Sequence, residues 1–308
     1  MNIRSKTTLR AVLTAYDDHL QRTCGLCAGT RRDYGFNVRK FLEASLGRSR
    51  LDLHGLRAEH VLSHIECRAR RLKPRSVKRI ATSLRSFFRF LRTKGMATDA
   101  LEHAVPSIPE WRLSTLPRGL SEEELKRFLA SLSTSTPRLQ RDRAMILCLA
   151  RLGLRAGEVA DLELEDIDWR AGTLRVRRRK SRREAVLPLP PDVGRAITAY
   201  LRGGRAKTCT TSRRVFVRHW QGVGKPVRSQ LVTQAVRYAL RDAGMDAPSH
   251  GAHLLRHTLA TRMVNRGTPL KEIADVLGHT SLSTTAIYAK VDLATLSDVP
   301  LPWPETAS

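Results

Sequence analysis

Apolar residues recur at helical spacing along most of this chain, and that periodicity limits its fold more than any other feature. Within the first hundred residues they fall three or four positions apart in four successive segments, which is the period of a helix that buries one face. The fourth segment begins after Lys73 with Pro74, a residue suited to a first helical turn, and ends at Gly95. The pattern predicts a four-helix domain over residues 1–105.

One short stretch follows a different period. Between Gly172 and Leu189, apolar residues alternate with arginines, give way to a charged turn and then resume, which predicts a pair of strands. From Ser229 onward the helical spacing returns, with breaks at glycines. The expected fold class is mainly α with a small β-sheet.

A proline-containing stretch divides the chain into two parts. Residues 102–118 contain three prolines and show no apolar period, as expected of an extended connector. Directly after it, Ser121 and Glu124 stand at the spacing of a helix-capping box. We therefore expect a connector over 106–118 and a second domain over 119–308.

The charge of the chain indicates the chemistry of its partner. Lys and Arg total 55 against 29 Asp and Glu, a formal net charge of +26, which implies a polyanion. Eleven bases and two Glu lie between Arg57 and Arg92, and seven bases with no acid lie between Arg175 and Arg183. We expect these stretches to face DNA through six residues: Lys73, Arg75, Lys78, Arg79, Arg177 and Arg179. Charge alone leaves open an RNA-binding protein of the ribosomal type or a membrane-surface protein.

Neither a membrane segment nor a metal site is expected. The basic N-terminus is not followed by an apolar segment, and no apolar run approaches the roughly 18 residues of a membrane span, so we expect a cytoplasmic, nucleoid-associated protein. Five scattered cysteines fit reduced thiols. Cys24 and Cys27 form a CxxC, but no second pair stands at zinc-site spacing. No metal and no cofactor is predicted.

The residues that suggest chemistry are cations in the second half of the chain, followed by a tyrosine. Arg155 lies between two glycines, His253 and Arg256 lie one helical turn apart, and His279 follows Leu-Gly and precedes Tyr288 by nine residues. Phosphoryl transfer requires an in-line nucleophile, charge balance on the phosphate oxygens and a proton for the leaving oxygen. Fixed cations can balance the charge on the phosphate oxygens without a metal. The sequence has no Gly-rich phosphate loop, so it does not indicate a nucleoside triphosphate.

Two segments carry a resemblance to a known family. Residues 252–291, AHLLRHTLATRMVNRGTPLKEIADVLGHTSLSTTAIYAKV, resemble the signature of the tyrosine recombinase or phage integrase family, and GLRAGEVADLELEDID from Gly153 resembles its first arginine box. The order of helical domain, linker, arginine box, hairpin, HxxR, LGH and tyrosine is similar from about Thr7 to Val291. The resemblance implies a SAM-like helical core-binding domain and an integrase-type catalytic domain that close around DNA as a clamp.

The resemblance also implies a role for each catalytic candidate. It makes Tyr288 the nucleophile, Arg155 and Arg256 the clamps on the scissile phosphate, and His253 and His279 hydrogen-bonding partners of that phosphate. These roles suit the chemistry, because a guanidinium bonds two phosphate oxygens at once. Nearby cations favour the phenolate of a tyrosine, and a neutral His253 can accept its proton.

In this family a lysine on a strand-pair turn protonates the departing 5′ oxygen. Counting back from the hairpin exit at Leu187 places this lysine at Lys180, the only lysine in the hairpin. The sequence departs from the family there, because arginines and a serine flank Lys180 where glycines are frequent. Glu158 is expected to support Arg155, and His257 is expected to support its neighbours rather than to react.

These features predict a site-specific DNA recombinase that cleaves and rejoins strands through a 3′-phosphotyrosyl intermediate without metal or ATP. Its expected partner is a double-stranded DNA site with inverted half-sites, on which it self-associates to a tetramer. Two alternatives remain: a type IB topoisomerase, which shares the chemistry, and a non-catalytic DNA-binding accessory protein. Phage, transposon, integron-like and chromosome-resolution roles all remain open.

Overall fold

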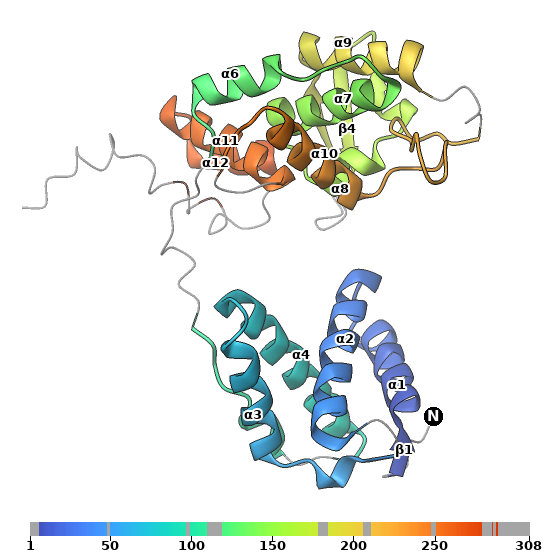
Figure 1. The fold of residues 1–308 in the computed structure, drawn as a ribbon, viewed down its shortest axis with the longest axis vertical. Coiled ribbons are helices and arrows are strands. Elements are labelled where there is room, and N and C mark those ends of the chain that lie inside the picture. The colour runs from blue at the N-terminus through green and yellow to red at the C-terminus, as the bar shows by residue number, and fades with distance from the viewer. Residues whose placement is uncertain are drawn as a thin grey trace, which may run out of the picture. The chain divides into compact units, whose positions relative to one another are not determined.

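The computed structural model describes residues 6–47, 50–96, 99–109, 119–177, 184–205, 211–247 and 251–278, together with Thr285 and Tyr288. The chain divides into two compact units, Met1–Arg112 and Leu113–Ser308 (Figure 1). Helices dominate both units, and each contains a small antiparallel sheet, so the predicted fold class is confirmed. Most of the predicted connector lies outside the described residues. No described helix is both long and apolar enough to cross a membrane.

The first unit is a set of helices around one apolar core. Its elements are β1 (Lys6–Thr8), α1 (Leu9–Arg22), α2 (Ala28–Leu46), β2 (Arg50–Asp52), the 3-10 helix η1 (Leu53–Gly55), α3 (Ala58–Ala69), α4 (Pro74–Thr93) and α5 (Asp99–His103). The four expected helices are present. The β1–β2 pair, with Thr7 opposite Leu51, was not predicted, because strands of three residues offer too few positions for an alternating pattern.

Helix α4 supplies much of the core of this unit. Its large apolar side chains are buried, three phenylalanines among them, and Phe87 meets the ring of Tyr16 edge-on at 5.2 Å between centroids. Pro74 occupies the first turn, where its missing N–H costs no helical hydrogen bond. The opposite face carries the exposed side chains of Arg75 and Arg79. One face of α4 therefore builds the core while the other presents cations.

The second unit surrounds a mostly buried helix, α7. Its elements are α6 (Glu122–Ala130), α7 (Pro137–Leu152), α8 (Ala156–Asp161), the 3-10 helix η2 (Leu164–Asp166), β3 (Ile167–Asp168), β4 (Thr173–Arg177), β5 (Glu184–Pro188), α9 (Pro191–Ala199), the π-helix η3 (Tyr200–Gly204), α10 (Ser229–Asp242), α11 (Ala252–Asn265) and α12 (Leu270–Leu277). Helix α7 packs against α8, α9, α10 and α11 (Figure 1). The predicted capping box starts α6, because Ser121 Oγ accepts from the N–H of Glu124 at 3.1 Å.

Strands β3, β4 and β5 form an antiparallel sheet in that order. Strands β4 and β5 are the predicted pair, with Leu174 opposite Leu187 and Arg177 opposite Glu184. Alternation along β4 buries Leu174 and Val176 and leaves Arg177 exposed, as expected for a strand with one face on a core. The charged turn that joins the two strands lies outside the described residues.

Candidate active site

Arg155 stands at the start of α8, directly after a tight turn that ends α7. Gly153 makes this turn with a φ of 62°, and a Cβ there would lie 2.9 Å from side-chain carbons of α11 and of Leu277, so the position requires glycine. Arg155 Nη1 donates to Glu158 Oε1 at 2.8 Å, and its Nη2 donates to the carbonyl oxygen of Gly278 at 3.1 Å. The expected support of Arg155 by Glu158 is therefore present.

Arg256 reaches the same place from α11. Its side chain is buried, its Nη1 donates to the carbonyl oxygen of Gly153 at 2.5 Å, and its Nη2 donates to the carbonyl oxygen of Leu277. Leu277 ends α12, and Gly278 caps that helix with a φ of 61°. The two arginines therefore bind adjacent peptide carbonyls, next in sequence to His279. The fold brings together three motifs that lie far apart in the chain.

Tyr288 lies in an apolar cluster of the same unit. Its side chain is 1% exposed, and it packs with residues of α11 and α12: Ala260, Val264, Ile273 and Leu277. Burial raises the pKa of its phenol to about 12, and the charge of Arg256 opposes that shift. The phenol is therefore protonated at neutral pH. In this structure the candidate nucleophile is buried and uncharged.

The imidazole that contacts Tyr288 belongs to His257. Its Nδ1 lies 2.6 Å from Tyr288 Oη. His253, which the sequence suggested as proton acceptor, is exposed one turn earlier on α11, with its ring centroid 6.3 Å from that of His257. Histidines four residues apart share one face of a helix. That spacing was the available sequence signal for His257, whose contact with the tyrosine was not predicted.

Three of the expected site residues, Lys180, His279 and Arg179, lie outside the described residues. Their roles stay predictions. The end of β4 next to the hairpin turn is described, and its surroundings are polar.

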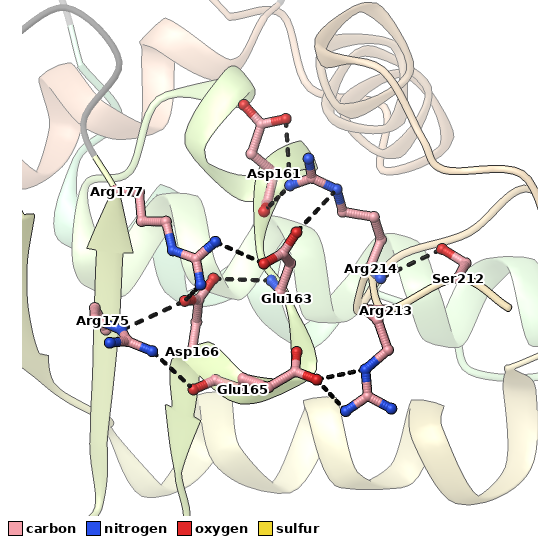
Figure 2. A network of polar contacts seen from close by, with 9 residues as sticks. All are labelled: Asp161, Glu163, Glu165, Asp166, Arg175, Arg177, Ser212, Arg213 and Arg214. Atoms are coloured by element: carbon pink, nitrogen blue, oxygen red, sulfur yellow. Dashed lines mark hydrogen bonds and ion pairs between the residues drawn. The ribbon is translucent and has the colours of Figure 1, made fainter. Parts of the chain in front are cut away.

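Arg177, the last residue of β4, belongs to a network of ion pairs next to the hairpin turn (Figure 2). Its Nη1 lies 2.6 Å from Glu163 Oε2, and its Nη2 lies 2.9 Å from Asp166 Oδ1. Arg214 contacts Glu163 at 3.8 Å and Asp161 at 3.5 Å. Asp166 is buried, so water competes little for its contacts. The network joins the hairpin to the segment that follows α8.

These ion pairs affect the expected role of Arg177. Two carboxylates already compensate its charge, so it adds little to the net attraction for a polyanion. A count of charges along the sequence could not reveal these partners, because they lie in η2 and the residue before it, outside the basic stretch that contains Arg177. The expectation that Arg177 contacts DNA stays a prediction, and its observed contacts hold the end of β4 next to the hairpin turn.

The expected DNA-binding residues of the first unit gather at the start of α4. Lys73 precedes the helix and Arg75 lies in its first turn, and both side chains are exposed. Lys78 is half-buried, and Arg79 lies 3.5 Å from Asp33 of α2. Because Arg79 and Asp33 are both more than half exposed, this ion pair is weak and leaves the arginine available to a phosphate.

The described part of the chain contains no group of three or more His, Cys, Asp or Glu side chains that could hold a metal ion. Cys24 and Cys27 are exposed, and no disulfide joins them. The described site residues instead offer two guanidinium groups, two imidazoles and a phenol within one unit.

Family models match both units. The model of the phage integrase family matches residues 118–294, and that of the phage integrase N-terminal SAM-like domain matches residues 13–95. The chain is 44% identical over 293 residues to the putative integrase/recombinase y4rA of Sinorhizobium fredii, covering 95% of this chain and 71% of that protein. It is 31% identical over 289 residues to the tyrosine recombinase XerA of Pyrococcus furiosus, covering 94% and 92%.

Solved structures show the same fold. A XerH site-specific recombinase bound to palindromic difH substrate, in a post-cleavage complex, has a TM-score of 0.72 at 17% identity, covering 95% of this chain and 85% of that one. A lambda integrase tetramer bound to a Holliday junction has a TM-score of 0.66 at 19% identity, covering 89% and 78%. At these identities the likeness concerns the fold.

Proposed function

Because the chain belongs to the phage integrase family and is a site-specific tyrosine recombinase that cleaves and rejoins DNA, we propose that Tyr288 forms the covalent bond to DNA. One observation carries this assignment. Arg155 and Arg256, from distant segments, bind adjacent carbonyls at the end of α12. The charge of Arg256 also acts on the phenol of Tyr288. A phosphate bound by both guanidinium groups would therefore contact Arg256, the same arginine whose charge acts on the phenol.

In the proposed reaction, Tyr288 Oη forms a bond to the phosphorus while the bond from phosphorus to the 5′ oxygen breaks. Arg155 and Arg256 compensate charge on the non-bridging oxygens, and their fixed positions mean that little reorganisation is needed. His253 and His279 are the proposed hydrogen-bond donors to the same oxygens. The phosphotyrosyl bond conserves the energy of the phosphodiester, so the 5′ hydroxyl of another strand can reverse the step without ATP.

Lys180 is the proposed donor of the proton that the leaving 5′ oxygen takes up. An ammonium group releases a proton far more readily than the guanidinium groups that flank it in sequence. The ion pairs of Arg177 with Glu163 and Asp166 support this role, because they hold in place the end of β4, three residues before Lys180.

We further propose that the substrate is double-stranded DNA with inverted half-sites, and that four copies of the chain act on two such sites. A site with two-fold symmetry suits two copies related by the same symmetry. The palindromic substrate of the XerH complex and the lambda integrase tetramer on a Holliday junction support this arrangement. The proposed place of action is the nucleoid in the cytoplasm.

A nicked DNA site tests the reaction. The site is built from inverted repeats in the DNA that flanks the gene, and the nick is placed so that cleavage releases a short 5′-hydroxyl fragment that diffuses away. We expect the protein to stay attached to the 3′ phosphate on a denaturing gel. The yield should be equal in EDTA, because fixed guanidinium groups supply the charge. An adduct that EDTA abolishes would contradict this mechanism.

A supercoiled plasmid without the repeats is the control for the alternative enzyme class. A recombinase should leave it supercoiled, because cleavage requires its own site. Relaxation of this plasmid would identify a type IB topoisomerase, which would also form an adduct on the nicked site because it shares the chemistry. Binding without any adduct would identify an accessory protein.

Charge reversal at the start of α4 tests the proposed DNA-facing surface. Replacing Lys73, Arg75, Lys78 and Arg79 with glutamate should weaken binding to all DNA sequences alike. For every phosphate that the variant no longer neutralises, the slope of log affinity against log salt should fall by about 0.9, because fewer counterions are released. Fluorescence anisotropy at several salt concentrations measures that slope.

The other end of the same helix provides a matched control. Arg89 and Arg92 share the carboxylate of Glu102, at 2.7 Å and 3.9 Å, so one of their two positive charges is already offset. The double variant Arg89→Glu, Arg92→Glu should therefore change the slope less than Lys73→Glu, Arg75→Glu. Equal slopes in the wild-type protein and both variants would place DNA on another surface.

A further inference from the structure

His257 holds the hydroxyl group of the proposed nucleophile. Its Nδ1 lies 2.6 Å from Tyr288 Oη, and the two ring centroids are 5.7 Å apart. Tyr288 is nearly inaccessible to solvent and packs against apolar residues of α11 and α12, so water competes little for this hydrogen bond. His257 follows Arg256 directly on α11. Arg256, one of the two arginines of the phosphate clamp, and this imidazole are therefore held by the same helix.

Both partners of this hydrogen bond are neutral at neutral pH. Burial lowers the pKa of His257, and the charges of His253 and Arg256 lower it further, so the imidazole is neutral at neutral pH. Burial raises the pKa of Tyr288 to about 12, so the phenol keeps its proton. Acceptance of the phenol proton by His257 requires the tautomer that carries its single proton on Nε2, in which the phenol O–H donates to Nδ1.

We propose that His257 accepts the proton of Tyr288 during strand cleavage. As Oη forms its bond to phosphorus and the bond to the 5′ oxygen breaks, the phenol proton moves to Nδ1 of His257. The leaving oxygen takes its own proton from Lys180. On rejoining, His257 returns the proton to Tyr288. The inference rests on the proposed role of Tyr288 as nucleophile.

The neighbouring arginine links this transfer to the presence of DNA. Without DNA, the charge of Arg256 opposes a second proton on His257. A scissile phosphate bound to Arg256 compensates that charge, so an imidazolium next to it costs less free energy. His257 then becomes a stronger base at the moment when the phosphate is in place. In the free protein the phenol stays protonated and buried.

Two nucleophiles of different acidity test the proton transfer. His257→Gln keeps a hydrogen-bond acceptor but cannot take up a proton, so single-turnover cleavage of the nicked site should slow by about two orders of magnitude. DNA affinity should be unchanged. With 3,5-difluorotyrosine at position 288, whose phenol releases its proton more readily, the same substitution should slow cleavage by less than about tenfold. A purely structural defect would slow both nucleophiles equally and would overturn the inference.

His253→Gln is the matched control, because it makes the same change one turn earlier on the same helix. His253 is proposed to bond the phosphate, so its loss should slow both nucleophiles by the same factor. If difluorotyrosine relieves His253→Gln and not His257→Gln, the base is His253 and the inference is wrong. Tyr288 would still be the nucleophile in that case. Failure of the wild-type protein to form any adduct would instead overturn the proposed function.

A measurement on the unmodified protein covers the case in which His257→Gln does not fold. Nitrogen-15 NMR of the histidine side chains distinguishes a bare ring nitrogen from a protonated one. We expect Nδ1 of His257 to be unprotonated and Nε2 to carry the proton in the DNA-free protein. A protonated Nδ1 would exclude acceptance of the phenol proton at that atom.

Discussion

Tyr288→Phe is expected to abolish covalent attachment to DNA while leaving DNA binding unchanged. The substitution removes one oxygen atom, and a phenyl ring cannot form a phosphotyrosyl bond. The ring fits the same apolar cluster of α11 and α12 residues. Leaving Nδ1 of His257 without its donor costs about 1–3 kcal/mol of unfolding free energy, which a folded domain of this size tolerates. A denaturing gel on the nicked site measures the adduct, and a gel shift measures binding.

Tyr238 provides the control for this substitution. It lies in the same unit, is 38% exposed, and has the guanidinium groups of Arg237 and Arg241 at 5.5 and 5.2 Å from its ring centroid. It is therefore an accessible tyrosine among cations, but it is not placed with Arg155 and Arg256. Tyr238→Phe should form the adduct at the wild-type level. Any adduct formed by Tyr288→Phe would move the nucleophile to another residue.

Arg256→Ala should reduce the cleavage rate by at least about two orders of magnitude, the effect of removing one preorganised charge-stabilising donor. The same substitution leaves the carbonyls of Gly153 and Leu277 without their guanidinium donor, which costs about 1–3 kcal/mol of unfolding free energy for each buried acceptor. Arg256→Lys should not restore activity, because one ammonium cannot reproduce the planar fork. Single-turnover cleavage and thermal unfolding separate the two effects.

Two further variants distinguish catalysis from stability. Arg155 is 31% exposed in its side chain, so Arg155→Ala should lose as much activity as Arg256→Ala with a smaller loss of stability. Arg262 lies on the same helix as Arg256 and pairs with Glu122 at 3.2 Å, so Arg262→Ala should cleave at close to the wild-type rate. Arg256→Ala cleaving within tenfold of wild type would contradict its assignment to the phosphate.

Most of the helices were predictable because their apolar residues follow one period for several turns, as in α4. The hairpin was predictable because the alternation in β4 interrupts that period over a few residues. Strands β1, β2 and β3 were missed, because two or three residues do not establish a period. Arg155 and Arg256 were recognised from motif resemblance, but their binding to adjacent carbonyls is a tertiary contact that neither motif specifies.

The contacts of His257 and Arg177 could not be predicted from the sequence. The sequence shows that His257 shares a helix face with His253, but not which of them meets Tyr288, because this depends on the path of the chain after α12. Similarly, the run of bases around Arg177 suggested a surface for DNA. Its pairing with Glu163 and Asp166 depends on how η2 lies against β4.

At the end of α12 the two arginines bind the main-chain oxygens of Leu277 and Gly278, and this limits which sequence changes the site tolerates. A point substitution at residue 277 changes the packing there but cannot delete a carbonyl, so the acceptor survives any codon change. Insertion or deletion of a single codon between α11 and the end of α12 shifts both acceptors along the chain at once. This stretch should therefore tolerate amino-acid substitutions far better than any change in its length.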